Sequence, residues 1–375
     1  MNVAVRAKLL SASLLLSALV LSGEALGFVY LHYIVRSGWR PGYYPSSPPG
    51  RAYLTEREPW GAWRVPNAEM RQTSRCFSVA LRANGFGMRD RDRRMAGDPH
   101  RTVVLGDSFA EGWGIPEEQR LSNLLEARLG REFLNFGIEN DVGPLQYQLI
   151  YEQLAARFTH DRVLILFLPD NDFTDNDAGY WRRFRLDFFR RHRPYYEATD
   201  DGGYRPFYPA AAAPQGWFAD GLEALRRNSW LLATLRYLRL RFLSRPPNYS
   251  GYVDFTDDEL RAVLWTFRRI KAAAGDRQVT VVVIPRPNDF RRVRDGGGNR
   301  LGPALARFGR DNGIRIVDLL PLMPTFEPHT ELYFLPCDGH WSALGNRVAA
   351  EALLSAMARE PGPEHAVSGA AAAAE

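Results

Sequence analysis

The stretch Thr102–Phe109, TVVLGDSF, decides how the rest of the chain is interpreted. Its first residues are apolar or β-branched and are stopped by Gly106, which indicates a short buried strand that runs into a tight turn. Such a turn places the hydroxyl group and the backbone N–H of Ser108 at the carboxyl end of the strand, where open α/β sheets bind their ligands. The stretch therefore predicts a parallel α/β sheet with a candidate nucleophile at its edge.

A serine nucleophile needs a general base and a group that orients this base. Residues 338–341, near the other end of the chain, read DGHW, so Asp338 and His340 are candidates for these two roles. A Gly-Asp-Ser sequence is also an ordinary turn, in which Asp107 or Ser108 caps the following helix. The segments between the two motifs distinguish these interpretations.

Residues 76–358 alternate between short apolar runs and amphipathic segments, which is typical of a parallel sheet covered by helices. The expected strands are Thr102–Leu105, Glu132–Phe136, Arg162–Leu168, Thr280–Ile284 and Arg315–Val317. The expected helices are Arg120–Leu129, Leu145–Phe158, Asp257–Ala274, Leu301–Asn312 and Ser342–Met357. Thr256 and Glu259 form a capping box before the third helix, and Gly313 suits the end of the fourth.

Residues 178–254 do not fit this alternation and are interpreted as an insertion in the domain. They contain one expected amphipathic helix, Gly221–Phe242. The insertion is rich in arginine and in aromatic residues, among them Trp181, Tyr195, Tyr196, Tyr204 and Trp217. These aromatic side chains either line a groove for an anionic glycan or pack a small core of the insertion's own.

Residues 9–35 are apolar with few breaks and are long enough to span about 30 Å of hydrocarbon. Arg6 and Lys8 precede them, so residues 1–8 are expected to stay in the cytoplasm and the rest of the chain to be exported. A cleaved signal and an uncleaved signal anchor are the two alternatives, and the absence of a clear cleavage site favours the anchor. Glu24 is costly in lipid and should lie near the outer interface or pair with a neighbour.

The anchor implies a single-pass protein of the cell membrane whose catalytic domain is extracytoplasmic, and periplasmic in a Gram-negative cell. Residues 36–75 are rich in proline and are expected to form an irregular stalk that wraps or spaces the catalytic domain from the membrane. Residues 359–375 end in a run of alanines and are expected to be a disordered tail.

The 375 residues have the composition of a globular protein, with 45% hydrophobic and 24% charged residues. The formal net charge of +5 comes almost wholly from arginine, because Lys8 and Lys271 are the only lysines. The arginines are scattered and are not part of a nucleic-acid motif, so nucleic acid is excluded as a partner. They suit either a mild attraction to anionic glycans or membrane surfaces, or simply a solvated basic face.

Four segments occur in a fixed order: GDSF at residues 106–109, NFG at 135–137, PDND at 169–172 and DGHW at 338–341. This order resembles the SGNH (GDSL-type) hydrolase superfamily, whose four blocks supply serine, glycine, asparagine and histidine. Residues 84–90, NGFGMRD, also look like the lead-in of its membrane-anchored members. The resemblance implies a three-layer α/β/α, flavodoxin-like sheet.

The resemblance also implies roles for individual residues. Ser108 would attack an ester carbonyl, His340 would take its proton, and Asp338 would orient the imidazole. The oxyanion hole would consist of the N–H groups of Ser108 and Gly137 and the side chain of Asn171. A glycine at position 137 is explained by the approach of substrate to the backbone.

Two positions depart from the superfamily pattern. Asp338 precedes His340 by two residues instead of three, a spacing known in some anchored members and in related polysaccharide O-acetyltransferases. Pro169 stands two residues before Asn171, where the superfamily has glycine, and this removes one N–H donor.

The predicted function is that of a serine ester hydrolase that acts on an O-acyl ester, such as an acetyl ester, through an acyl-enzyme. One alternative is an O-acetyltransferase that modifies a cell-envelope polysaccharide. A second is a catalytically idle glycan-binding or assembly protein, which the intact set of four blocks disfavours. No cofactor and no metal are expected, since no Cys/His cluster has ligand spacing and no glycine-rich phosphate loop occurs in its usual context.

Cys76 and Cys337 are the only cysteines. In an oxidising compartment they are candidates for a disulfide, which would pin the loop of Asp338 to the segment before the first strand. The alternative is two free buried thiols.

Overall fold

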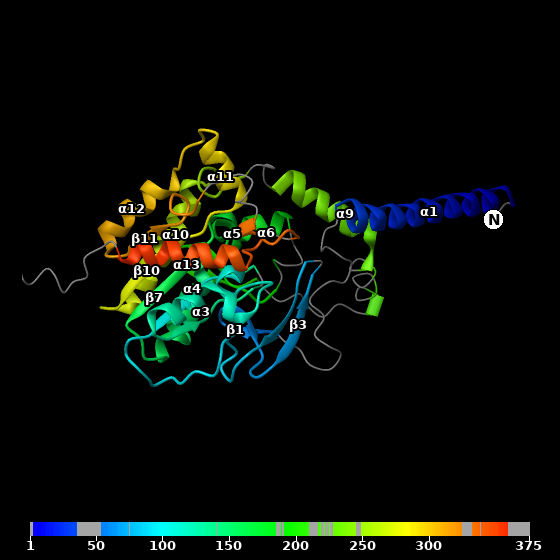
Figure 1. Cartoon of the computed structure of the whole chain (residues 1–375). Helices are drawn as coiled ribbons and strands as arrows, with labels where there is room; N and C mark the ends of the chain where they lie inside the picture. The colour runs from blue at the N-terminus through cyan, green and yellow to red at the C-terminus, as the bar shows by residue number, and fades with distance from the viewer. Residues whose placement is uncertain are drawn as a thin grey trace, which may run out of the picture.

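The computed structural model of the protein has a parallel sheet of five strands at its centre (Figure 1). The strands are β5 (Thr102–Leu105), β6 (Phe133–Asn135), β7 (Arg162–Phe167), β10 (Gln278–Val283) and β11 (Arg315–Asp318). Their order across the sheet is β11-β10-β7-β5-β6, the flavodoxin-like order in which the progression reverses at the first strand. The predicted parallel α/β sheet and its strands are therefore confirmed.

Most of the chain is described by the structure. The described residues are 3–35, 54–74, 76–139, 141–184, 189, 191–209, 217–218, 221, 225, 228–244, 249–324, 332–337 and 339–358. The predicted tail 359–375 and Asp338 lie outside them.

Helices cover both faces of the sheet. They include α3 (Leu121–Leu129), α4 (Pro144–Gln153), α10 (Asp257–Ala274), α12 (Leu301–Asn312) and α13 (Ala343–Ala358). α3 contacts α13, and α4 contacts α10. Because right-handed crossovers on the two sides of β5 run in opposite directions, these two pairs lie on opposite faces. The predicted capping box is present at α10, where the Glu259 N–H donates to Oγ1 of Thr256 at 3.2 Å.

The segment before the sheet contains regular structure. β1 (Leu54–Glu58) pairs with β2 (Gly61–Arg64), and β3 (Glu69–Thr73) pairs with β4 (Ser78–Arg82), both antiparallel. Trp63 and Arg64 are buried against the main core. The irregular conformation expected here is thus wrong for the described residues, because Pro59 and Pro66 lie in the turns between strands and leave the strands intact.

The insertion contains more elements than the one helix that was expected. These are α6 (Ala178–Phe184), β8 (Tyr195–Ala198), β9 (Tyr204–Phe207) and α9 (Trp230–Arg239), which continues to Ser244 as η4 (Leu240–Ser244). Trp181 and Tyr195 belong to a small hydrophobic cluster and are only 5% and 0% exposed. These two aromatic residues therefore pack the insertion's own core and offer no surface to a glycan.

The N-terminal apolar segment is a single long helix. α1 (Val3–Val29) continues to Ile34 through η1 (Tyr30–Ile34). The span Val5–Ile34 is long and apolar enough to cross a membrane, a property that an uncleaved anchor and a signal sequence share. α1 projects away from the sheet and contacts α9 of the insertion (Figure 1).

Candidate active site

The turn after β5 presents Ser108 at the edge of the sheet. Gly106 has a φ of +155°, and a Cβ there would come within 2.7 Å of the Ala110 side chain. Asp107 then caps the short helix α2 (Ser108–Glu111) by accepting the Phe109 N–H at 2.8 Å. The capping interpretation of the motif is therefore confirmed for Asp107, and Ser108 is the first residue of the helix, whereas its role as nucleophile stays a prediction.

Ser108 and His340 form a hydrogen-bonded pair. Oγ of Ser108 lies 2.8 Å from Nε2 of His340, although 232 residues separate them. The imidazole lies near two aromatic rings, with centroid distances of 5.0 Å to Phe109 and 5.5 Å to Trp113. This arrangement leaves the imidazole few orientations and gives the serine an adjacent base.

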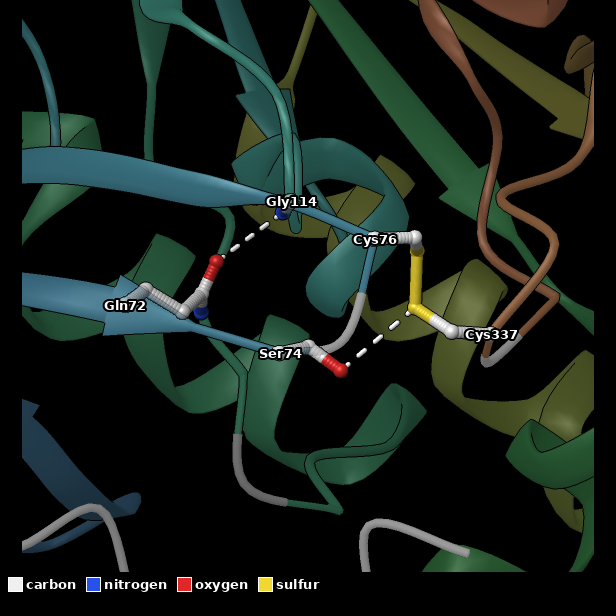
Figure 2. The surroundings of a disulfide bond; sticks show 5 residues. All are labelled: Gln72, Ser74, Cys76, Gly114 and Cys337. Atoms are coloured by element: carbon white, nitrogen blue, oxygen red, sulfur yellow. Dashed lines mark hydrogen bonds between the residues drawn. A yellow bond between two sulfur atoms is a disulfide. The ribbon is translucent and has the colours of Figure 1, made fainter. Parts of the chain in front are cut away.

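The loop that carries His340 is held from two sides. The backbone carbonyl oxygen of His340 accepts the Leu335 N–H at 2.6 Å. A disulfide joins Cys337 to Cys76, which lies just before β4. Figure 2 shows the disulfide beside the hydroxyl group of Ser74, whose Oγ is 3.4 Å from Sγ of Cys337. The loop of His340 is thus linked covalently to the N-terminal strands. Asp338 lies in the same loop but outside the described residues, so its orienting role stays a prediction.

Asn171 lies at the end of the neighbouring strand β7, in the helix α5 (Pro169–Asp175). Its Nδ2 donates to Oδ2 of Asp175 at 2.7 Å and to Oδ2 of Asp107 at 3.3 Å. The amide is thereby held beside Asp107, the residue that precedes Ser108. Pro169 occupies the first turn of α5, where a backbone N–H has no partner within the helix, so its lack of a donor costs the helix nothing.

Gly137 follows β6, on the other side of β5. Its N–H donates to Oδ1 of Asn135 at 2.9 Å. A Cβ at this position would lie 2.5 Å from the backbone nitrogen of Glu111. The explanation of this glycine by substrate approach therefore needs correction, because contact with α2 alone already requires it.

Buried carboxylates surround Asn171. Burial raises the pKa of Asp107, against the opposing effects of the Phe109 N–H and of the positive charges that His340 and Arg286 can carry. Burial also raises the pKa of Asp172, and the nearby charges of Asp107 and Asp175 add to this effect. These groups were not predicted from the sequence apart from the suggestion that Asp107 holds the turn.

Tyr147 fixes Asp172 within this group. Its hydroxyl group donates to Oδ1 of Asp172 at 2.7 Å, and the Leu168 N–H donates to Oδ2 at 2.8 Å. Asp172 therefore shapes the turn that presents Asn171 and, being fully buried, has no surface for substrate. Within the part of the chain that the structure describes, no group of acidic, histidine or cysteine residues has the geometry of a metal site.

Arg286 adds a positive charge on the side of His340. It follows β10, and its guanidinium lies 5.6 Å from the centroid of the Phe109 ring. A Cβ on Gly339 would lie 3.1 Å from one of its nitrogens. The sequence analysis missed Arg286, although a polar residue just after the carboxyl end of an expected strand is a signal for a site residue.

Arg89, in the lead-in segment 84–90, binds the end of helix α2, which begins at Ser108. Its buried guanidinium donates to the carbonyl oxygens of Glu111 at 2.9 Å, of Gly112 at 2.6 Å and of Ile115 at 2.6 Å. These carbonyls lie at or just after the end of α2, so Arg89 satisfies backbone groups that the short helix leaves without partners.

Residues 274–374 match the family model described as "SGNH hydrolase-like domain, acetyltransferase AlgX". The C-terminal part of the catalytic domain is thus similar to the SGNH (GDSL-type) superfamily. The family match includes the block of His340 and does not include that of Ser108.

Solved structures that are similar to this chain include lipolytic and carbohydrate-active proteins. One is a GDSL-family lipolytic protein from Veillonella parvula, with 12% identity, a TM-score of 0.34 and coverage of 70% of this chain and 100% of that one. A lipase/acylhydrolase from Enterococcus faecalis has 13% identity, a TM-score of 0.36 and coverage of 69% and 95%.

A third is a carbohydrate esterase family 2 enzyme with a carbohydrate-binding domain from Corynascus thermopiles, with 13% identity, a TM-score of 0.35 and coverage of 75% and 70%. These scores are too low for anything about the activity of this chain to follow from them. The search among curated proteins found no match.

Proposed function

We propose that this SGNH protein cleaves a carboxylic ester with Ser108 as nucleophile and forms an acyl-enzyme. The observation that carries the proposal is the distance of 2.8 Å between Oγ of Ser108 and Nε2 of His340. A hydroxyl group within hydrogen-bond reach of an imidazole is the minimum arrangement for an activated serine.

In the first step Oγ of Ser108 attacks the carbonyl carbon while Nε2 of His340 takes its proton. The tetrahedral intermediate then collapses, the alkoxide leaves, and the imidazolium returns the proton to it. The acyl group is now an ester of Ser108. An acceptor hydroxyl attacks this ester in the second step, with His340 again as base, and the free serine is restored.

The oxyanion of each intermediate needs donors that are already in place. The three proposed donors are the backbone N–H groups of Ser108 and Gly137 and the Nδ2 group of Asn171. The Asn171 amide would turn from Asp107 to the oxyanion, because its bond of 3.3 Å to that acid is the weaker of its two. The Gly137 N–H already binds Asn135, so it would contribute through a shared, three-centre bond.

Asp338 is the proposed partner of the imidazole, by its place in the superfamily pattern. Asp338→Asn would keep the size of the side chain and remove its charge, so the imidazolium would lose stabilisation during both steps. We expect turnover to fall strongly while the fold is retained.

The second candidate function is transfer of an acetyl group to a hydroxyl group of a cell-envelope glycan. It is favoured by the family match, whose description names an acetyltransferase. The acyl-enzyme is common to both reactions, and only the acceptor differs, water in one case and a sugar hydroxyl in the other. In either case we propose that α1 anchors the protein in the cell membrane and that the catalytic domain lies outside the cytoplasm.

The first experiment compares wild-type protein with Ser108→Ala on p-nitrophenyl acetate and on a fluorophosphonate probe. We expect the substitution to abolish both turnover and labelling without a change in the fold. Equal labelling of the two proteins would remove Ser108 from the mechanism. His340→Ala should lose turnover in the same way.

The second experiment supplies an activated acetyl donor with and without envelope oligosaccharides and follows the products by mass spectrometry. Faster formation of acetylated sugar than of free acetate would favour the transferase over the hydrolase. Acetate alone, at the same rate with and without sugar, would favour the hydrolase.

A further inference from the structure

Helix α9 packs lengthwise against the outer part of α1. The side chain of Leu231 lies over Gly23, and the ring centroids of Tyr237 and Tyr30 are 6.4 Å apart. Later residues of α9 thus meet later residues of α1, and the two helices run in the same direction. That direction leads away from the positively charged end of α1, which stays in the cytoplasm under the topology proposed above.

The two helices approach closely at a glycine. A Cβ on Gly27 would lie only 2.7 Å from the carbonyl oxygen of Trp230, so a larger residue there would push α9 away. Oγ1 of Thr234 lies 3.4 Å from the carbonyl oxygen of the same glycine. Small residues at points of close approach are a common feature of paired helices in membranes.

Glu24 gives a second, independent sign of this pairing. Its carboxylate accepts the Trp230 N–H at 2.6 Å and also the hydroxyl group of Ser229. Glu24 lies 10 residues before Ile34, the end of the apolar span, which is about 15 Å along a helix, and so falls inside a hydrocarbon core of about 30 Å whose outer boundary is at Ile34. The N-terminus of α9 supplies the donors and the positive dipole that a carboxylate at this depth requires.

The surface of α9 that α1 does not cover is apolar. Leu232 and Leu235 are 40% and 53% exposed, and Phe242 and Leu243 of η4 are 62% and 67% exposed. Leu235 is four residues after Leu231 and so lies near the same side of α9, but its exposure shows that α1 does not cover it. They continue the apolar surface of α1 itself, where side chains such as Leu21 and Leu26 are about as exposed.

We propose that α9 and η4 lie in the outer half of the bilayer beside α1, and that lipid acyl chains cover their exposed apolar face. Ten residues of helix, about 15 Å, match half of the hydrocarbon core. Arg236, Arg239 and Arg241 lie toward the outer end of this segment, at the level of the headgroups. The protein thus has two membrane-embedded helices, and the insertion holds the catalytic domain at the membrane surface.

The test uses the full chain in nanodiscs of phosphatidylcholine and phosphatidylglycerol. A nitroxide on Leu235→Cys reports its collisions with oxygen, which concentrates in lipid, and with a water-soluble nickel complex. Leu19→Cys on α1 is the lipid reference and Ala273→Cys on α10 the aqueous reference, both at exposed positions. The native cysteines are joined in the disulfide and do not take the label.

We expect the label at Leu235 to behave like that at Leu19. Behaviour like that at Ala273 would overturn the proposal, as would spin–spin broadening that places a second copy of the chain on this face. Gly27→Leu should shift the Leu235 label toward water, whereas Ala25→Leu, at an exposed neighbouring position, should not. An unchanged depth in Gly27→Leu would overturn the pairing of α9 with α1.

Discussion

The guanidinium of Arg64 and the carboxylate of Glu111 lie 2.8 Å apart, and both side chains are completely shielded from solvent. Arg64 is the last residue of β2, and Glu111 is the last residue of the helix that Ser108 opens. The same guanidinium donates to the carbonyl oxygen of Gly137 at 2.9 Å. Arg64 of the N-terminal hairpin therefore contacts both helix α2 and the loop of Gly137, which border the candidate site.

Removal of this cation should destabilise the protein strongly. Arg64→Met leaves the Glu111 carboxylate buried without its partner, which typically costs about 3–5 kcal/mol in the free energy of unfolding. The matched control is Arg82→Met, since Arg82 pairs with Asp92 at 3.3 Å on the surface, where a pair contributes about 1 kcal/mol or less. Urea unfolding of the full chain, followed by tryptophan fluorescence, measures the difference. Equal losses in the two variants would contradict a structural role for the buried pair.

Glu139 should make stability depend on pH. Burial and the charge of Glu111 raise its pKa to about 8 from an ordinary value of 4.5. The folded protein therefore keeps a proton that the unfolded chain releases, and this group lowers stability as the pH rises between these two values. Glu139→Gln cannot lose a proton, so its stability relative to wild type should increase through this window and level off above it.

Urea unfolding at about pH 5.5, 7 and 8.5 measures this difference, because subtraction of the wild-type curve cancels the other titrating groups. Glu118→Gln, at an exposed position, is the control for the loss of a carboxylate as such. A constant difference between Glu139→Gln and wild type at all three values would show that the carboxyl group does not titrate as expected.

The disulfide should matter more for turnover than for the fold. Cys76→Ser, Cys337→Ser or both would free the loop that carries His340 from the N-terminal strands. A base displaced by about 1 Å can cost up to about 100-fold in rate, whereas the large core of the sheet remains. Turnover of p-nitrophenyl acetate and circular dichroism separate the two effects.

Thiol labelling of the denatured, unreduced wild type should find no reactive cysteine, and two reactive thiols per chain would reject the bridge.

The sequence was informative where structure depends on local pattern. The β-branched runs at Val103 and Val281 became strands, and the order of the four blocks anticipated that Ser108 and His340 would meet. It was misleading where prolines were taken to exclude strands, because Pro59 lies in a turn and leaves its neighbours free to pair.

Contacts between residues far apart in the chain could not be predicted from the sequence. Glu24 was recognised as a costly charge, but nothing in its surroundings indicates that its partner is Trp230, 206 residues away. The ion pair of Arg64 with Glu111 is hidden for the same reason, since neither residue has a periodic pattern that marks its partner. Such pairs are specified by packing, which a single sequence does not display.

Asn171 and Asn176 provide a contrast that separates catalysis from stability. Asn171 is partly exposed beside Asp107, whereas Asn176 is completely buried and donates to Gln146 at 2.7 Å and to the carbonyl oxygen of Pro194 at 3.2 Å. Asn171→Ala should lower kcat by about 10²–10³, the usual effect of one missing oxyanion donor, and change the free energy of unfolding little.

Asn176→Ala should do the reverse. It leaves buried partners unsatisfied, which costs about 1–3 kcal/mol for each group, but the folded fraction should turn over substrate at the wild-type rate. The readouts are kcat for p-nitrophenyl acetate, corrected for the folded fraction, and urea unfolding of each variant. A loss of stability in Asn171→Ala as large as that in Asn176→Ala, with kcat per folded molecule unchanged, would make Asn171 a structural residue and leave the oxyanion to other donors.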